Sequence, residues 1–163
     1  MRAVQVLVWA AIGISLCRRV RKSPQSAKKI ARITAGWLLF LIFLQCAMAV
    51  RGGYASLQTL LPLHLCSAIA VLTVPMMIRW DVRFFPLSWY LGMPGALLAL
   101  CVPVYGFSPW PHLAQAVFTA THATLVFAPL LMRCAGVQPT RLSAWYAFAA
   151  GNGLLVLAEI TNG

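Results

Sequence analysis

Long apolar segments recur along the whole sequence and leave little room for a soluble fold. Hydrophobic residues make up 61% of the chain and charged residues only 9%, and the mean hydropathy is +0.83. A small soluble domain exposes a large share of its surface, so a 17.8 kDa chain could not hide this much apolar area from water. The composition therefore excludes a soluble enzyme, a disordered chain and an ordinary nucleic-acid-binding domain. It predicts a polytopic membrane protein.

Hydropathy predicts an all-α membrane protein with one domain over residues 1–163, a bundle of about six transmembrane helices. The expected spans are residues 4–16, 33–50, 57–78, 84–107, 113–132 and 142–160. Each span must be helical, because an open strand would leave its peptide groups without hydrogen bonds in lipid. The first span is short against the ~20 residues that a bilayer requires. The connections are short, so neighbouring helices should run antiparallel.

The basic residues predict how the bundle is oriented. The chain has 13 Lys and Arg but 2 Asp and Glu, a net charge of +11. Residues 17–32, expected as a loop, carry seven of the basic residues: Arg18, Arg19, Arg21, Lys22, Lys28, Lys29 and Arg32. If this loop is cytoplasmic, every basic residue except Arg2 and Arg51 lies inside, as the positive-inside rule requires. We therefore expect both termini outside, anionic lipid headgroups at the basic loop, and no nucleic-acid partner.

Three polar side chains are expected at one depth in three different spans. Cys66 and His122 each lie nine residues into a span that enters from outside, and Asn152 lies eight residues from the outer end of the last span. At 1.5 Å per residue, all three are roughly 12–14 Å below the outer surface. A thiol, an imidazole that takes its proton and an amide that orients the imidazole are the parts of a Cys–His–Asn nucleophilic site. Cys66, His122 and Asn152 are thus candidate catalytic residues.

Simpler interpretations of the same residues stay open. A membrane-embedded Cys is usually small apolar filler, a His often bonds to a neighbouring helix, and Asn152 between two glycines could hold a tight helix crossing. His64 and His112 are candidate supporting residues. A metal site at His64, Cys66 and His122 is disfavoured, because residues two apart point to different sides of a helix. The five cysteines include no C-x-x-C pair, which argues against a disulfide framework or a zinc finger. We expect no metal and no organic cofactor.

Several motifs in the sequence resemble those of the YwaF-like family of integral membrane proteins. The matching segments are residues 61–66 (Leu-Pro-Leu-His-Leu-Cys), residues 92–100 followed by Pro103, residues 111–113 (Pro-His-Leu) and the downstream His122. The resemblance covers about residues 33–160. Leu113 stands where the family has Phe, and the sequence ends at Gly163 where relatives continue into a further helix.

The resemblance implies an activity. The family is distantly related to a vertebrate TMEM-series acyltransferase that remodels ether phospholipids through a Cys and a His, which by motif correspond to Cys66 and His122. One hypothesis is therefore a cysteine- and histidine-dependent lipid acyltransferase that acts on membrane lipid. The alternative is a non-catalytic membrane protein: a small-molecule permease, a binding subunit or a scaffold. The resemblance also implies a multi-pass protein of the bacterial inner membrane. The sequence does not predict protein partners.

Overall fold

The described part of the protein is helical throughout. The computed structural model describes residues 2–23, 25–53, 55, 65–102 and 111–162, and no strand occurs within these ranges. Five of the helical segments are α1 (Arg2–Lys22), α2 (Gln25–Arg51), α4 (Leu65–Arg79), α7 (Pro111–Cys134) and α8 (Arg141–Asn162). A sixth is continuous through α5 (Phe85–Leu87), the π-helical turn η1 (Ser88–Gly92) and α6 (Met93–Cys101). An all-α fold with six helical segments is thus confirmed for the described residues.

The basic segment 17–32 is not the loop that hydropathy predicts. α1 continues to Lys22 and α2 begins at Gln25, so only Ser23 and Pro24 separate the two helices in the sequence. Arg and Lys are good helix formers, and their long side chains carry the charge away from the apolar stretch that precedes or follows them. A hydropathy scan ends a span at such residues although the helix continues. α1 therefore has 21 residues, long enough to cross a bilayer.

Three described helices are long and apolar enough to span a membrane. They are Ala3–Lys22, Gln25–Arg51 and Pro111–Cys134, and the helices Leu65–Arg79 and Phe85–Cys101 are apolar but shorter. Large apolar side chains are exposed on α1, α2, α6 and α8, among them Leu7, Phe43, Leu98 and Trp145. In water such surfaces would associate, whereas in a bilayer they face lipid. The expected spans 113–132 and 142–160 agree with α7 and α8 to within two residues.

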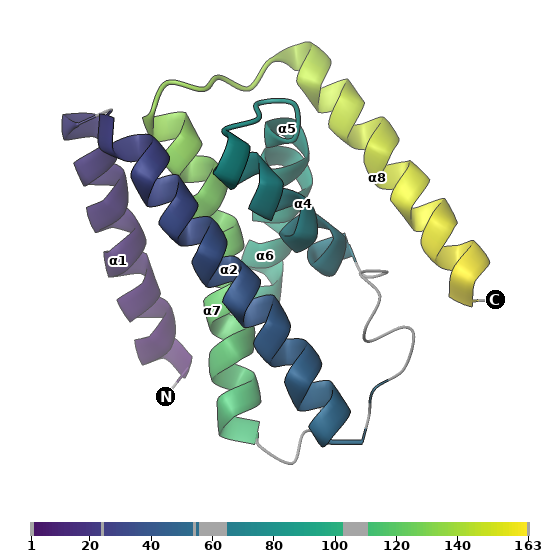
Figure 1. Cartoon of the computed structure of the whole chain (residues 1–163). Helices are drawn as coiled ribbons and strands as arrows, with labels where there is room; N and C mark the ends of the chain where they lie inside the picture. Colours follow the sequence, from purple (N-terminus) through teal and green to yellow (C-terminus); the bar gives the residue numbers. More distant parts are fainter. Residues whose placement is uncertain (1, 24, 54, 56–64, 103–110, 163) are drawn as a thin grey trace.

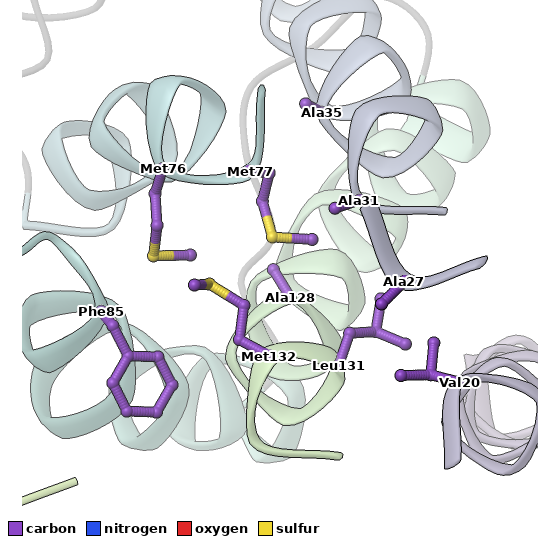
Figure 2. Packing of buried hydrophobic residues seen from close by; sticks show 10 residues of the cluster. All are labelled: Val20, Ala27, Ala31, Ala35, Met76, Met77, Phe85, Ala128, Leu131 and Met132. Carbon is purple, nitrogen blue, oxygen red and sulfur yellow. The ribbon is translucent and has the colours of Figure 1, made fainter. Parts of the chain in front are cut away.

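α7 is the central helix of the bundle (Figure 1). Of its most apolar stretch 72% is buried inside the protein, against 11% for α1, because α1, α2 and α6 all pack against α7. Figure 2 shows one of the core clusters around it, in which side chains from α1, α2, α4, α5 and α7 meet: Val20, Ala27, Ala31, Ala35, Met76, Met77, Phe85, Ala128, Leu131 and Met132. The three alanines of α2 are spaced by four residues and so share one face, where their small size lets α2 approach its neighbours closely.

The connections that carry basic residues lie at one end of the bundle. The end of α1, the start of α2, the ends of α4 and α7 and the start of α8 are all at the top of Figure 1. Residues 18–32, Arg79, Arg83, Arg133 and Arg141 belong to these ends. We call this the basic end. This agrees with the prediction that consecutive helices run in opposite directions, which brings every second connection to the same end of the bundle. That the basic end is cytoplasmic, with both termini outside, stays a prediction.

The segment from α5 to α6 is fixed to α4 by one polar contact and one close approach. The hydroxyls of Thr73 and Ser88 are 3.3 Å apart, and both side chains are buried. A Cβ at Gly92 would lie 2.6 Å from the side chain of Ile69, so only glycine allows this contact. The expected span 84–107 agrees with the described residues 85–101, and residues 103–107 lie outside the described part.

α8 lies at the edge of the bundle (Figure 1). It packs mainly against α5 and η1, where the Tyr90 hydroxyl donates to the carbonyl oxygen of Thr140 at 3.2 Å. The start of the helix is capped reciprocally, since the Thr140 backbone N–H donates to the Ser143 hydroxyl and the Ser143 N–H to the Thr140 hydroxyl. Trp145 and Phe148 stay exposed.

Candidate functional site

Cys66 lies in the first described turn of α4 and faces α6. Its side chain is half-buried, and its Sγ atom would be 3.8 Å from a Cβ added at Gly95. The absence of a side chain at Gly95 therefore leaves room beside the thiol. Cys66 is one of five cysteines with a free thiol, and the four others are distributed over α1, α2, α6 and α7.

His122 is buried at the middle of α7, with 7% of its surface exposed. Its Nδ1 atom is 2.8 Å from the carbonyl oxygen of Phe118, and its ring stacks on the Phe118 ring with centroids 4.0 Å apart. A carbonyl oxygen only accepts hydrogen bonds, so this contact favours the tautomer with the proton on Nδ1. In the neutral imidazole the proton-accepting nitrogen is then Nε2. The local geometry of α7 thus gives His122 the tautomer and the fixed ring that a general base needs.

The helices that carry Cys66 and His122 are neighbours. α4 and α7 contact each other, and α6, against which Cys66 lies, packs closely on α7. Residues 65–78, 85–101 and 111–132 contain no Lys, Arg, Asp or Glu. A thiolate would therefore meet no cationic side chain from these segments, and deprotonation of the thiol would depend on a nearby base such as the imidazole.

Asn152 does not have the environment that a residue orienting His122 requires. It is exposed on α8, and its Nδ2 atom donates to the carbonyl oxygen of Phe148 at 2.8 Å. The principal contacts of α8 are with α5 and η1 rather than with α7. The described contact of the His122 ring nitrogen Nδ1 is with the Phe118 carbonyl oxygen. A contribution of Asn152 to binding a substrate oxygen stays a prediction.

Of the two supporting histidines, only His112 belongs to the described residues. His64 lies outside the described residues. His112 is exposed in the first turn of α7, ten residues before His122, which corresponds to about 15 Å along the helix axis. Within the described ranges, no group of three His, Cys, Asp or Glu residues is close enough together to hold a metal ion.

Three polar residues of α7 and α2 near His122 are absent from the sequence-based site. Thr121 donates to the Val117 carbonyl and accepts a hydrogen bond of 3.4 Å from Gln45 Nε2, which joins α2 to α7. The Thr119 hydroxyl is fully buried and has no hydrogen-bond partner within the described residues. They are polar groups close to His122 in the sequence or bonded to its neighbour Thr121. The aromatic residue four positions before His122 is the signal that could have revealed the stacking.

The match to a protein family covers the whole chain. The sequence model of the TMEM164 family matches residues 1–163. The chain belongs to the TMEM164 family. This membership confirms the relationship to a TMEM-series family that the motifs around Cys66 and His122 suggest, and it gives no support to the YwaF-like name. No curated protein and no solved structure matches the chain significantly.

The TMEM164 family assignment and the exposed apolar helices together identify an integral membrane protein. The match also extends to residues 1–32, before the region in which the YwaF-like motifs occur. α1 and the basic end are therefore part of the family's common sequence rather than an addition to it.

Proposed function

We propose that this protein is a membrane acyltransferase in which Cys66 is the nucleophile and His122 the general base. The observation that carries the proposal is the buried His122, whose Nδ1 proton is directed to the Phe118 carbonyl. Since α7 contacts the helix of Cys66, the basic Nε2 and the thiol belong to adjacent elements. The resemblance to an ether-phospholipid acyltransferase supports the same pair.

The proposed reaction has two balanced steps. Nε2 of His122 takes the thiol proton as Sγ of Cys66 attacks the carbonyl carbon of a phospholipid ester. The C–O bond of the ester breaks, an acyl thioester forms on Cys66, and the departing lysolipid oxygen receives the proton from His122. The hydroxyl of a second lysolipid then attacks the thioester and loses its proton to His122, which returns it to Cys66. No metal or organic cofactor is needed.

Asn152 has a secondary place in this proposal. Its amide could donate to the oxyanion that forms on the acyl carbonyl oxygen, which such sites commonly stabilise. For this it would exchange its present bond to Phe148 for one to the substrate. We expect Asn152→Ala to reduce the rate less than either Cys66→Ala or His122→Ala does.

The basic end is the proposed cytoplasmic side. Its Lys and Arg residues would hold the protein against anionic lipid headgroups, each contributing about 1 kcal/mol near a charged surface. This orientation puts both termini outside and fits a multi-pass protein of a bacterial inner membrane. Cysteine accessibility to a membrane-impermeant maleimide, with single cysteines introduced at Gln138 and Gly53, tests the orientation. In intact cells, labelling of Gly53→Cys but not of Gln138→Cys supports this orientation. Labelling of Gln138→Cys but not of Gly53→Cys overturns it.

Trapping of the thioester tests the enzyme hypothesis. Protein in bilayers is incubated with a phospholipid that carries an alkyne at the end of one acyl chain, and the acyl group on the protein is detected before and after hydroxylamine. We expect hydroxylamine-sensitive labelling of the wild type, none of Cys66→Ala and little of His122→Ala. Cys46→Ala is the matched control, since Cys46 is another half-buried cysteine and lies on α2.

The same experiment distinguishes an acyltransferase from a non-catalytic membrane protein. A permease, binding subunit or scaffold would bind lipid without forming a thioester. Equal labelling of the wild type and Cys66→Ala, or no labelling of a folded wild type in any lipid mixture, would contradict the acyltransferase proposal.

A further inference from the structure

A cavity with a cationic rim lies where α1 and α2 meet at the basic end. It has a volume of about 290 Å³, and its polar lining consists of Arg19, Ser26, Lys29 and Thr34. Arg19 and Lys29 are exposed, so their charged groups can reach a ligand at the cavity mouth. Two cations are usual partners of a phosphate group, whereas the Ser26 hydroxyl donates to the Ser23 hydroxyl at 3.2 Å.

Neither cation of this rim has a carboxylate partner within the described residues. The sequence has two acidic residues. Asp81 is 3.4 Å from Arg83, and Glu159 lies near the end of α8, the helix whose main contacts are with α5 and η1. The charge of Arg19 and Lys29 is therefore available for an anion from outside the chain.

A second cavity of about 290 Å³ adjoins the first, between α1, α2 and α7. The two cavities share Leu16, Ile33 and Thr34 in their linings, and we call the two together the hairpin groove. The far part of the groove is bounded by Trp9 and Trp37, whose rings are 5.9 Å apart. α1, α2 and α7 lie side by side around it (Figure 1).

The inner part of the hairpin groove is apolar even where the sequence has hydroxyls. The Thr34 hydroxyl donates to the Ile30 carbonyl at 2.9 Å, and the Thr124 hydroxyl donates to the Ala120 carbonyl at 2.7 Å. Both groups are thus used within their own helices. The groove has cations at its mouth and hydrocarbon inside, the polarity of a phospholipid rather than of a free phosphate.

The length of the groove fits one leaflet. Trp9 and Arg19 are ten residues apart on α1, about 15 Å along the helix. The hydrocarbon core of a bilayer is about 30 Å thick, so the groove extends from the headgroup level to about the midplane. A lipid seated in it would keep its headgroup level with those of its own leaflet.

The groove is separate from the proposed acyl-transfer site. Thr124 and Leu131, which line it, follow His122 by two and nine residues on α7. At about 100° per residue, both are turned roughly 160–180° from the imidazole. An acyl chain in the groove therefore lies on the opposite side of α7 from Nε2 and is not in position to be the substrate.

We infer that the hairpin groove binds one anionic phospholipid as a resident ligand, independently of any activity of Cys66. The phosphate lies between Arg19 and Lys29, and one acyl chain runs along Leu16 and Ile33 towards Trp9. The lipid fills the space between α1 and the rest of the bundle on the side of the membrane to which the basic end belongs.

Photo-crosslinking in lipid nanodiscs tests this site. The probe is phosphatidylglycerol with a diazirine in one acyl chain, added at a low fraction to phosphatidylcholine, and the labelled peptides are mapped by mass spectrometry. We expect labels concentrated on residues 9–16, 33–37 and 124–131. Arg19→Gln/Lys29→Gln should weaken binding by about 30-fold, because each cationic contact to an anionic lipid is worth about 1 kcal/mol.

The matched control is Arg18→Gln/Lys28→Gln, which removes the same charge from exposed neighbours that do not line the groove. This variant and Cys66→Ala should both label as the wild type does, and a phosphatidylcholine probe should label the groove weakly. If both double variants lose labelling by the phosphatidylglycerol probe equally, the lipid is attracted to the basic surface as a whole rather than to the groove. That result would overturn the inference. Labelling spread evenly over exposed helices, such as α8, would do the same.

Discussion

The Nδ1 atom of His122 lies 2.8 Å from the carbonyl oxygen of Phe118, one helical turn earlier, and the two rings stack. Phe118→Leu keeps the carbonyl but removes the ring. We expect thioester formation on Cys66 to slow by up to about tenfold, since an aromatic pair contributes about 0.5–1.5 kcal/mol. Initial rates of acyl labelling measure this change. Phe127→Leu, on another face of α7, is the control and should leave the rate near that of the wild type.

Gly13 determines how closely α1 approaches α7. A Cβ at this position would overlap the ring of Phe127, so an added methyl group must displace the ring or the helix. We expect Gly13→Ala to lower the free energy of unfolding by about 1–3 kcal/mol, as overpacking does. Denaturant unfolding in detergent measures it.

A double-variant cycle identifies the cause of that loss. Gly13→Ala combined with Phe127→Leu should cost less than the sum of the two single changes, because the smaller side chain makes room for the methyl group. Strict additivity would show that Gly13 and Phe127 do not constrain each other.

Gly95 determines the space around the Cys66 thiol. A Cβ at this position would be in ordinary contact with Sγ at 3.8 Å, so alanine fits, whereas leucine would extend into the space that the thiol occupies. We expect Gly95→Ala to leave the maleimide reactivity of Cys66 within about twofold of the wild type, and Gly95→Leu to reduce it at least about tenfold. Equal reactivity of all three proteins would contradict this placement of α4 against α6.

Cys17 of α1 and Cys134 of α7 are neighbours that pack on the same core cluster. In a variant that retains only these two cysteines, a mild oxidant should cross-link α1 to α7. The product is detected after proteolysis between the two helices, as fragments that separate only on reduction. A variant that retains Cys17 and Cys101 instead should give no intramolecular cross-link. If the Cys17 and Cys101 variant cross-links with a yield similar to that of the Cys17 and Cys134 variant, the packing of α1 on α7 is contradicted.

The sequence predicts helices best where apolar stretches end sharply. α7 and α8 agree with expectation to within two residues, because Pro111 and the basic residues Arg133 and Arg141 mark their ends. The first two spans are too short in the prediction, since residues 17–22 and 25–32 are charged and helical at once. Hydropathy measures transfer into lipid rather than helix formation, and the two properties differ at Arg and Lys.

The candidate site is less predictable than the fold. Depth along a helix follows from counting residues, so the position of His122 at the middle of α7 agrees with expectation. Which side of a helix meets which neighbour depends on packing of the whole bundle, so the exposed position of Asn152 does not follow from its depth. The Phe118 carbonyl is a backbone group, so its contact with His122 cannot be predicted from a pattern of side chains.

The wide helical turn at Ser88–Gly92 sets the angular position of everything that follows it up to Cys101. Such a turn holds one residue more than an ordinary one, so deletion of a single residue there would restore the usual pitch and leave Gly95 on nearly the same side of the helix, towards Cys66. Deletion of a residue from the regular helix between the wide turn and Gly95 would instead rotate Gly95 by about 100° and bring a bulkier neighbour to the sulfur. The segment can therefore shorten by one amino acid at the wide turn without losing the clearance beside the thiol, but not within the regular helix that follows it.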